Sequence, residues 1–154
     1  MTDVDRIERE VVIEAPVERV WTLLTEPEHV GTWFGDAGAE IDLRPGGEMV
    51  LRWAEHGAAQ GQVEQVEPPH LFSYRWAPFK EPGGMEPAEG NSTLVEFTLA
   101  AEGDATRVRV VESGFESLDV SEAQRRENLE GNRQGWEIEL GHLVEHAGKV
   151  AARA

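Results

Sequence analysis

The chain of 154 residues has no cysteine, which excludes disulfide bonds, thiolate nucleophiles and cysteine-ligated zinc. Lysine is almost absent as well: only Lys80 and Lys149 occur, and 14 basic residues stand against 30 acidic ones, for a formal net charge of −16. A surface of this sign repels a phosphate backbone and an anionic bilayer. We therefore expect neither nucleic acid nor a membrane as a partner, and we interpret the charge as a source of solubility.

Long apolar runs are missing too, since no segment approaches the roughly 18 residues of a membrane span. The polar, acidic N-terminus predicts no secretory signal. With 40% hydrophobic residues, a chain of this length can bury about 70% of its unfolded surface. We expect one domain over residues 1–154, in the cytoplasm, as a monomer or homodimer. The bias toward arginine, alanine and glycine suggests a bacterial source.

Hydrophobic periodicity predicts an α+β fold. A strand is expected at 6–14 and an amphipathic helix at 16–25, and Pro27 can begin a second short helix that ends near Trp33 and Phe34. After Gly35 the apolar residues recur every second position, between turns rich in glycine and proline. This alternation predicts six further strands in an antiparallel meander, near 37–43, 49–53, 58–67, 72–76, 95–99 and 108–110.

The last segment predicts one long helix over residues 121–151. Ser121 and Gln124 resemble a capping box, whereas Gly131 and Gly135 weaken or interrupt the helix. The helix carries the largest apolar stripe of the chain, which can cover the apolar face of the strands. We therefore expect a curved seven-stranded sheet around this helix, with the two short helices closing one end. The stripe consists of Leu129, Trp136, Leu140, Leu143, Val144, Ala147 and Val150.

Short segments in a fixed order carry a resemblance over almost the whole chain. They are Ile13-Glu14-Ala15-Pro16-Val17-Glu18-Arg19-Val20-Trp21, Pro27-Glu28-His29 with Trp33, Pro45-Gly46-Gly47, Gly61-Gln62-Val63, Pro68-Pro69-His70-Leu71 with Trp76, Thr106-Arg107-Val108, Glu112-Ser113-Gly114-Phe115, and Gly135-Trp136 with Leu140 and Leu143. Together they resemble the START/SRPBCC superfamily, whose helix-grip fold is that of the birch pollen allergen. Within it, the chain is similar to the activator of Hsp-90 ATPase homologue-like group.

The resemblance implies a cavity between sheet and helix that holds a small apolar or amphipathic molecule. Some members of the superfamily carry such ligands, whereas others are cyclases or hydrolases. The favoured hypothesis is a ligand-binding protein without catalysis. Two alternatives stay open: a polyketide cyclase-like enzyme that uses the same cavity, and a co-chaperone-like interaction module. A chaperone partner is possible, but no residue of the sequence supports one. The resemblance alone does not imply such a partner, because proteins that share a fold can differ in function.

The aromatic residues are the main candidates for the binding site. Trp21, Trp53, Trp76 and Trp136 all fall on faces predicted to point inward, where they could form a plain core or the wall of a cavity. The predicted lining is Trp53, Trp76, Phe97 and Trp136. The predicted mouth is Trp33, Phe34 and a loop over 77–91.

Glu112 is the most specific single candidate for ligand binding. It continues the alternation of Val108 and Val110, so its carboxylate should point inward, where burial raises its pKa above about 4.3. It could fix a polar group of the ligand or act as an acid or base. Alternatively, the strand ends before Glu112 and the side chain reaches solvent or an arginine. As a ligand contact, Glu112→Gln should weaken binding about tenfold with little change in melting temperature, whereas a salt bridge predicts lowered stability.

Motifs for other chemistry are weak or missing. His142 and His146 fit a His-x-x-Glu-His pattern, but both should point away from the apolar stripe, and no acidic third ligand follows Glu145. A nucleophile elbow, a phosphate loop and a dinucleotide fingerprint are absent from the sequence. We therefore predict no catalytic residues, no metal and no cofactor.

Overall fold

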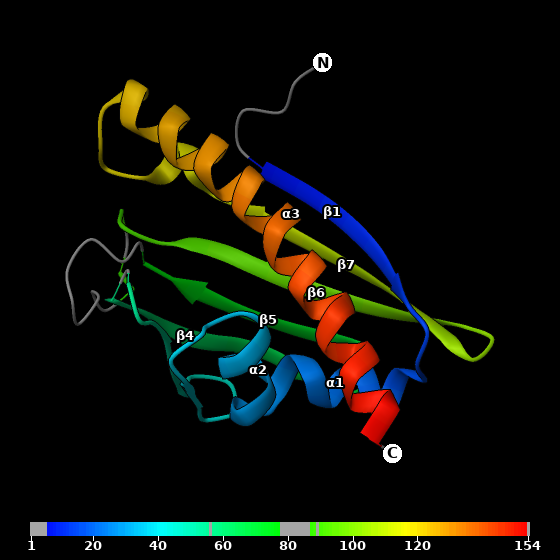
Figure 1. The fold of residues 1–154 in the computed structure, drawn as a ribbon. Coiled ribbons are helices and arrows are strands. Elements are labelled where there is room, and N and C mark those ends of the chain that lie inside the picture. Colours follow the sequence, from blue (N-terminus) through cyan, green and yellow to red (C-terminus); the bar gives the residue numbers. More distant parts are fainter. Residues whose placement is uncertain (1–5, 56, 78–86, 89, 154) are drawn as a thin grey trace.

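The computed structural model describes residues 6–55, 57–77, 87–88 and 90–153, without the side chains of residues 152 and 153. Most of the loop predicted over 77–91 lies outside the described residues. Figure 1 shows the order of the elements along the chain. They are β1 (Arg6–Ile13), α1 (Val17–Thr25), α2 (Pro27–Trp33), β2 (Ala39–Ile41), β3 (Glu48–Trp53), β4 (Gly57–Glu67), β5 (Leu71–Trp76), β6 (Thr93–Glu102), β7 (Ala105–Ser113), a short 3₁₀ helix η1 (Phe115–Ser117) and α3 (Glu122–Arg153).

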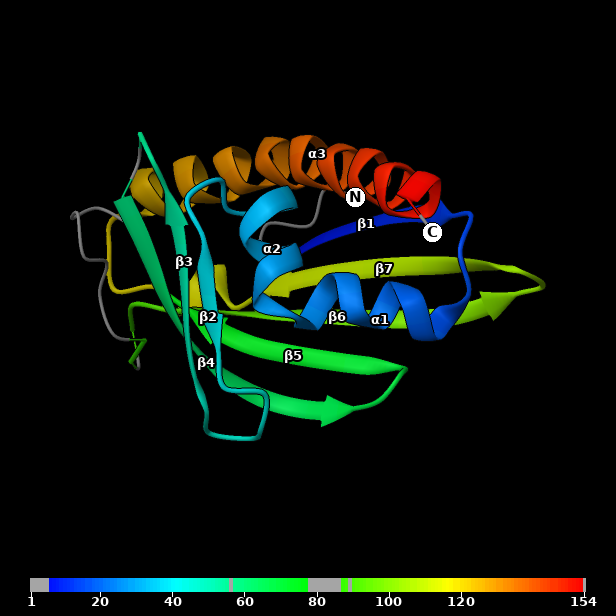
Figure 2. The same cartoon turned by 60° about the horizontal axis from the view of Figure 1, so that its bottom comes forward.

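The seven strands form one antiparallel sheet in the order β1-β7-β6-β5-β4-β3-β2. Strands 2 to 7 therefore pair with their neighbours along the chain, as a meander does, and β1 closes onto β7. The sheet bends around α3 and the two short helices (Figure 2). The predicted α+β helix-grip architecture is confirmed, although β2 is shorter than the alternation over 37–43 predicted. The backbone N–H groups of Asp36 and Ala37 both bond to the carbonyl of Arg52 there, before strand pairing begins.

The helix α3 runs across the sheet as one unbroken element through Gly131 and Gly135, so the predicted interruption is wrong. The Ser121 hydroxyl accepts a bond from the backbone N–H of Gln124 at 3.1 Å, which is half of a capping box. Val144 is a second correction, because 42% of it is exposed, whereas Leu143 and Ala147 are buried. The buried stripe is thus narrower than the sequence predicted, and it continues to the half-buried Val150.

Strict alternation along β7 decides where its side chains lie. Thr106, Val108, Val110 and Glu112 point into the core, and all are at most 1% exposed. Arg109, between them, points outward and pairs with Glu8 of β1. No helix among the described residues has a stretch long and apolar enough to span a bilayer.

Candidate functional site

The site is built around Glu112, where three neighbouring strands and α3 meet. The strands β5, β6 and β7 bring Trp76, Thr93 and Glu112 to one end of the sheet, and Trp76 lies directly opposite Thr93 in the register. One face of α3 supplies Asn132 and Trp136, which are four residues apart and therefore neighbours on the helix. Glu112 faces inward, as predicted, because β7 continues to Ser113; the alternative in which the strand ends earlier is wrong.

Four side chains donate hydrogen bonds to the Glu112 carboxylate. The indole N–H of Trp136 donates to Oε1 and that of Trp76 to Oε2, both at 2.8 Å. The Thr93 hydroxyl donates to Oε2 at 2.5 Å, and Asn132 Nδ2 lies 3.1 Å from both oxygens. In the described part of the chain, no arginine or lysine pairs with Glu112, so the predicted salt-bridge alternative is wrong. Instead, Glu112 holds the four surrounding side chains in place.

The charge of Glu112 depends on two opposed effects. Complete burial raises its pKa above the ordinary value, and the four donated hydrogen bonds act in the opposite direction. The upward shift that the sequence predicts is therefore confirmed. Because an indole N–H can only donate, each carboxylate oxygen must accept from one tryptophan. This arrangement suits the ionised form, in which both oxygens are acceptors.

A pocket of about 160 Å³ adjoins this network; we call it the Asn132 pocket. Two polar residues that bond Glu112, Thr93 and Asn132, form part of its wall, and the rest is mostly apolar. Trp76 presents its ring, and η1 and the segment after it add Phe115 and Leu118. The lining residues are Trp76, Ala77, Thr93, Phe115, Leu118, Asn128 and Asn132.

The predicted lining aromatics lie together, but their rings pack against one another. Phe34 is the centre of this cluster, with ring centres 5.2 to 5.6 Å from those of Trp53, Trp76 and Trp136. Phe97 packs edge-on against Trp136 at 5.7 Å. Side chains therefore fill the middle of the expected cavity, and hollow space lies on either side of the cluster. Trp76 lines the Asn132 pocket, and Trp33, Phe34 and Trp53 line a cleft on the other side.

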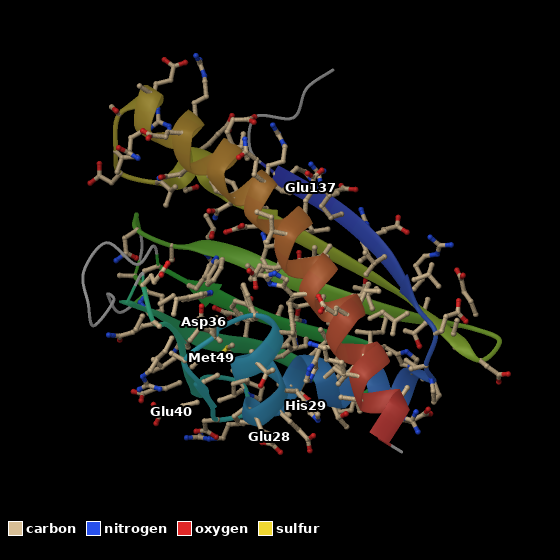
Figure 3. The ribbon with its side chains drawn as sticks, viewed as in Figure 1. Glu28, His29, Asp36, Glu40, Met49 and Glu137 are labelled. Atoms are coloured by element: carbon tan, nitrogen blue, oxygen red, sulfur yellow. The ribbon has the colours of Figure 1, made fainter. Side chains whose placement is uncertain are left out.

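That cleft lies between α2 and the C-terminal half of α3 and measures about 560 Å³; we call it the outer cleft. Figure 3 labels three of its residues: Glu28 and His29 belong to α2, with His29 beside the C-terminal turns of α3, and Asp36 lies beyond the end of α2. Its walls carry several carboxylates as well as histidines. The lining residues are Glu28, His29, Thr32, Trp33, Phe34, Gly35, Asp36, Trp53, Glu139, His142, Glu145, His146, Lys149 and Val150.

His146 is half-buried in this cleft, where His29 Nδ1 lies 2.9 Å from His146 Nε2. Such a contact holds one proton between the two nitrogens, so it joins α2 to α3 while at least one ring is neutral. No motif in the sequence pairs these histidines, which are 117 residues apart. His142, by contrast, is exposed, and its Nδ1 lies 3.5 Å from Glu139 Oε1. Among the described residues, no group of three His, Asp or Glu side chains is placed to hold a metal ion.

Two further titratable groups lie near the aromatic cluster, the half-buried Glu139 and the buried Tyr74. Burial raises the pKa of Glu139 to about 8, and the charge of Asp36 adds to this rise. Burial also raises the pKa of Tyr74, helped by the charges of Glu112 and Glu139. Within the described residues, the Tyr74 hydroxyl and Glu139 Oε2 have no hydrogen-bond partner. A carboxyl group whose pKa is raised by burial thus lies beside each hollow: Glu112 beside the Asn132 pocket and Glu139 in the outer cleft.

Sequence reasoning missed several residues of the site. Thr93 could have been found, since it has the same parity as Val95 and Phe97 on a predicted inward face. Asn132 lies one turn before Trp136 on α3, so its helical position is the signal. Phe115 and Leu118 belong to a short connection with no periodicity, which gives no comparable signal.

The curved antiparallel sheet, the long C-terminal helix across it and the buried site between them define a START/SRPBCC helix-grip protein. A family model described as "Activator of Hsp90 ATPase homolog 1-like protein" matches residues 14–148. The chain belongs to this family. A comparison with curated proteins gives no match.

Solved structures support the same architecture. DynU16, a protein of the dynemicin biosynthetic locus, is 23% identical with a TM-score of 0.73; the match covers 94% of this chain and 47% of DynU16, so this chain spans about half of that protein's length. CalU16 from Micromonospora echinospora is 26% identical with a TM-score of 0.68, and the match covers 96% of this chain and 79% of that one. An HSP90 activator from Plasmodium falciparum is 18% identical with a TM-score of 0.72, covering 94% and 96% of the two chains.

Proposed function

We propose that this protein binds a small, largely apolar molecule in the Asn132 pocket, beside the Glu112 network. The observation that carries the proposal is a fully buried carboxylate that fixes two polar side chains on the wall of an otherwise apolar pocket. Ligand sites commonly combine an apolar lining with a few placed polar groups in this way. Trp76 belongs both to the pocket wall and to the aromatic cluster around Phe34, in which the predicted residues Trp53, Phe97 and Trp136 pack.

The geometry favours binding over catalysis by Glu112. Its oxygens are completely buried and accept bonds from Trp76, Thr93, Asn132 and Trp136. A group that exchanges protons with a substrate must come within hydrogen-bond reach of it. Here the surrounding donors stand between Glu112 and the pocket. We therefore assign Glu112 the role of a residue that positions the lining, in place of the direct ligand contact or catalytic group considered from the sequence.

A co-chaperone role is the second candidate, because the family takes its description from an Hsp90 activator and one structural relative is such a protein. A docking face of that kind would present apolar side chains together. The large apolar side chains exposed in the described structure are Val12, Leu43, Ile138 and Val144. Ile138 and Val144 both lie on α3, but they are six residues apart and so about 120° from each other around the helix, and the other two lie on β1 and on the loop before β3. This distribution gives the binding proposal the better support.

Filling the Asn132 pocket and the outer cleft in turn, each with a larger side chain, tests the proposal. Leu118→Phe adds bulk to the Asn132 pocket, and Thr32→Phe adds a ring to the outer cleft as the matched control. Native mass spectrometry of protein from its own host, and calorimetric titration with a small aromatic alcohol, report the bound molecule. We expect Leu118→Phe to lose binding and Thr32→Phe to keep it. Loss in Thr32→Phe alone would place the ligand in the outer cleft, and no binding by the unmodified protein would refute the proposal.

A further inference from the structure

We infer that Leu118 is the gate of the Asn132 pocket and that Arg125 is the latch that holds this gate closed. The inference rests on the proposed function and adds how a ligand enters and leaves the same site. It concerns residues 114–120, which connect β7 to α3 and are yellow in Figure 1; we call them the η1 segment. The entrance lies apart from the mouth that the sequence predicted at Trp33, Phe34 and the loop over 77–91.

Leu118 separates two hollows. It is 4% exposed and lines the Asn132 pocket. It also lines a second hollow of about 850 Å³, and among the described residues no other residue lines both. Most walls of this second hollow are exposed or half-buried, so it opens to solvent, and moving Leu118 aside joins the pocket to it. The hollow is lined by Gln62, Arg75, Pro87, Ala88, Gly90, Ser92, Ser117, Leu118 and Asp119.

The backbone of the η1 segment is bonded mainly to itself. Three of its backbone hydrogen bonds join residues within the segment, at 2.9 to 3.2 Å. Among the described residues, one backbone bond links it to another part of the chain, from the N–H of Asp119 to the carbonyl of Gly90 at 2.6 Å. The segment begins at Gly114, whose φ of 95° favours glycine. It can therefore move without breaking the sheet or α3.

Arg125 ties this segment to α3. Its Nη1 donates to the carbonyl of Leu118 at 3.2 Å and to that of Val120 at 2.7 Å. The first of these bonds holds the peptide group of the gate residue itself. Hydrogen bonds from a charged donor are about twice as strong as those between neutral groups. The half-buried Arg125 thus supplies the strongest polar contact that we find between α3 and the η1 segment in the described structure.

The neighbouring Arg126 provides a matched control. It lies on the same turn of α3, but it is exposed, and its Nη2 pairs with Glu122 Oε1 of the same helix at 3.3 Å. A lysine provides a second comparison. Both bonds of Arg125 come from a single nitrogen, and a lysine ammonium also offers several hydrogens on one nitrogen. Arg125→Lys should therefore keep much of the latch.

A latch changes rates more than affinity. The gate is closed in the free protein and is closed again over a bound ligand, so a weaker latch favours opening in both states by a similar factor. Association and dissociation then both become faster, and Kd changes little. A residue that only stabilises the fold would not raise the dissociation rate, and one that only shapes the pocket wall would not raise the association rate.

NMR line-shape analysis of benzyl alcohol titrations, followed at the Trp76 indole N–H, measures both rate constants. Arg125→Met should raise the association and dissociation rates together by about tenfold or more, with Kd within about threefold, because it removes two bonds from a charged donor. Arg125→Lys should restore most of the slow exchange. Arg126→Met should change neither rate.

Unchanged rates in Arg125→Met would overturn the inference, because the ligand would then enter elsewhere, for example past the half-buried Asn128 and Asn132. Faster dissociation alone, with weaker affinity, would overturn it as well, since Arg125 would then only shape the wall. Either result leaves the proposed function standing. Absence of binding by the unmodified protein would instead refute the proposed function, and the inference with it.

Hydrogen exchange of the unmodified protein decides the question if Arg125→Met does not fold. The amides of Leu118 and Asp119 should exchange at least tenfold faster than those of Val108 and Val110 in β7, because the η1 segment opens locally while the sheet stays intact. Exchange of all four amides at the rate of global unfolding would show that the segment does not open by itself, and would overturn the inference.

Discussion

Replacing Glu112 by glutamine tests the idea that a buried carboxylate organises the site. The two indoles donate to different oxygens, Trp136 to Oε1 and Trp76 to Oε2. Glutamine has one oxygen and one NH₂ group, so one indole N–H must face another donor. A buried donor left without a partner costs about 1–3 kcal/mol. Removing the charge offsets part of this loss, because burial disfavours the ionised form.

We therefore expect Glu112→Gln to lower the free energy of unfolding by about 1–3 kcal/mol, a loss of roughly 3–10 °C in melting temperature for a chain of this size. This differs from the small stability effect expected of a side chain that only contacts ligand. Urea unfolding and calorimetry at pH 7 give the two values. Glu40→Gln is the control, since the Glu40 side chain is 67% exposed and its loss should fall within about 0.5 kcal/mol.

A second substitution identifies the cause of the loss. If an orphaned indole is responsible, adding Trp76→Phe or Trp136→Phe to Glu112→Gln should cost less than the same change in the unmodified protein. Unfolding free energies of the single and double variants measure this coupling. A Glu112→Gln protein as stable as the original, or more stable, would refute the reasoning, because it would show that the burial of charge outweighs the four hydrogen bonds.

Two further results are expected. The folded protein holds the Glu139 proton up to a pKa of about 8, whereas the unfolded chain releases it near the ordinary value of 4.5, so stability falls as pH rises through this window. Glu139→Gln should remove this pH dependence. The free energies of unfolding of the variant and the original protein should agree near pH 4.5, and the variant should be the more stable of the two near pH 8.5. The same dependence of stability on pH in both proteins would contradict the assignment. A Cβ on Gly47 would lie 2.0 Å from the carbonyl oxygen of Asp42, whereas one on Gly131 meets nothing within 4 Å. Gly47→Ala should therefore lower the melting temperature strongly, whereas Gly131→Ala should raise stability by about 0.5–1 kcal/mol. A Gly47→Ala variant that melts at a higher temperature than Gly131→Ala would contradict the described backbone.

Most of the fold could be predicted from the sequence because periodicity is a local signal. The strand alternation through Val108, Val110 and Glu112 also predicted the direction of the key side chain correctly. The prediction for β2 was too long, since local alternation cannot show that the N–H groups of Asp36 and Ala37 bond to Arg52 instead. Val144 was misplaced because the apolar stripe of α3 is narrower than the hydrophobic residues suggested.

The site was harder to predict, because its contacts join residues far apart in the chain. Glu112 bonds residues 19 to 36 positions away, and His29 meets His146 across 117 positions. Periodicity indicated that the aromatic residues share an interior. It could not show that Phe34 fills the space between Trp53, Trp76 and Trp136, which divides the expected cavity into two hollows.

The indole N–H signals of the five tryptophans offer the most direct test of ligand binding in the Asn132 pocket. Trp76 lines this pocket, whereas Trp33 and Trp53 line the outer cleft and bond to the carbonyls of Leu23 and Phe34. Titration with benzyl alcohol, followed by NMR with signals assigned by tryptophan-to-phenylalanine variants, should shift the Trp76 indole and the Asn132 side-chain amide saturably, and leave Trp33 and Trp53 in place. Shifts confined to Trp33 and Trp53, or none at saturating probe, would contradict the central claim.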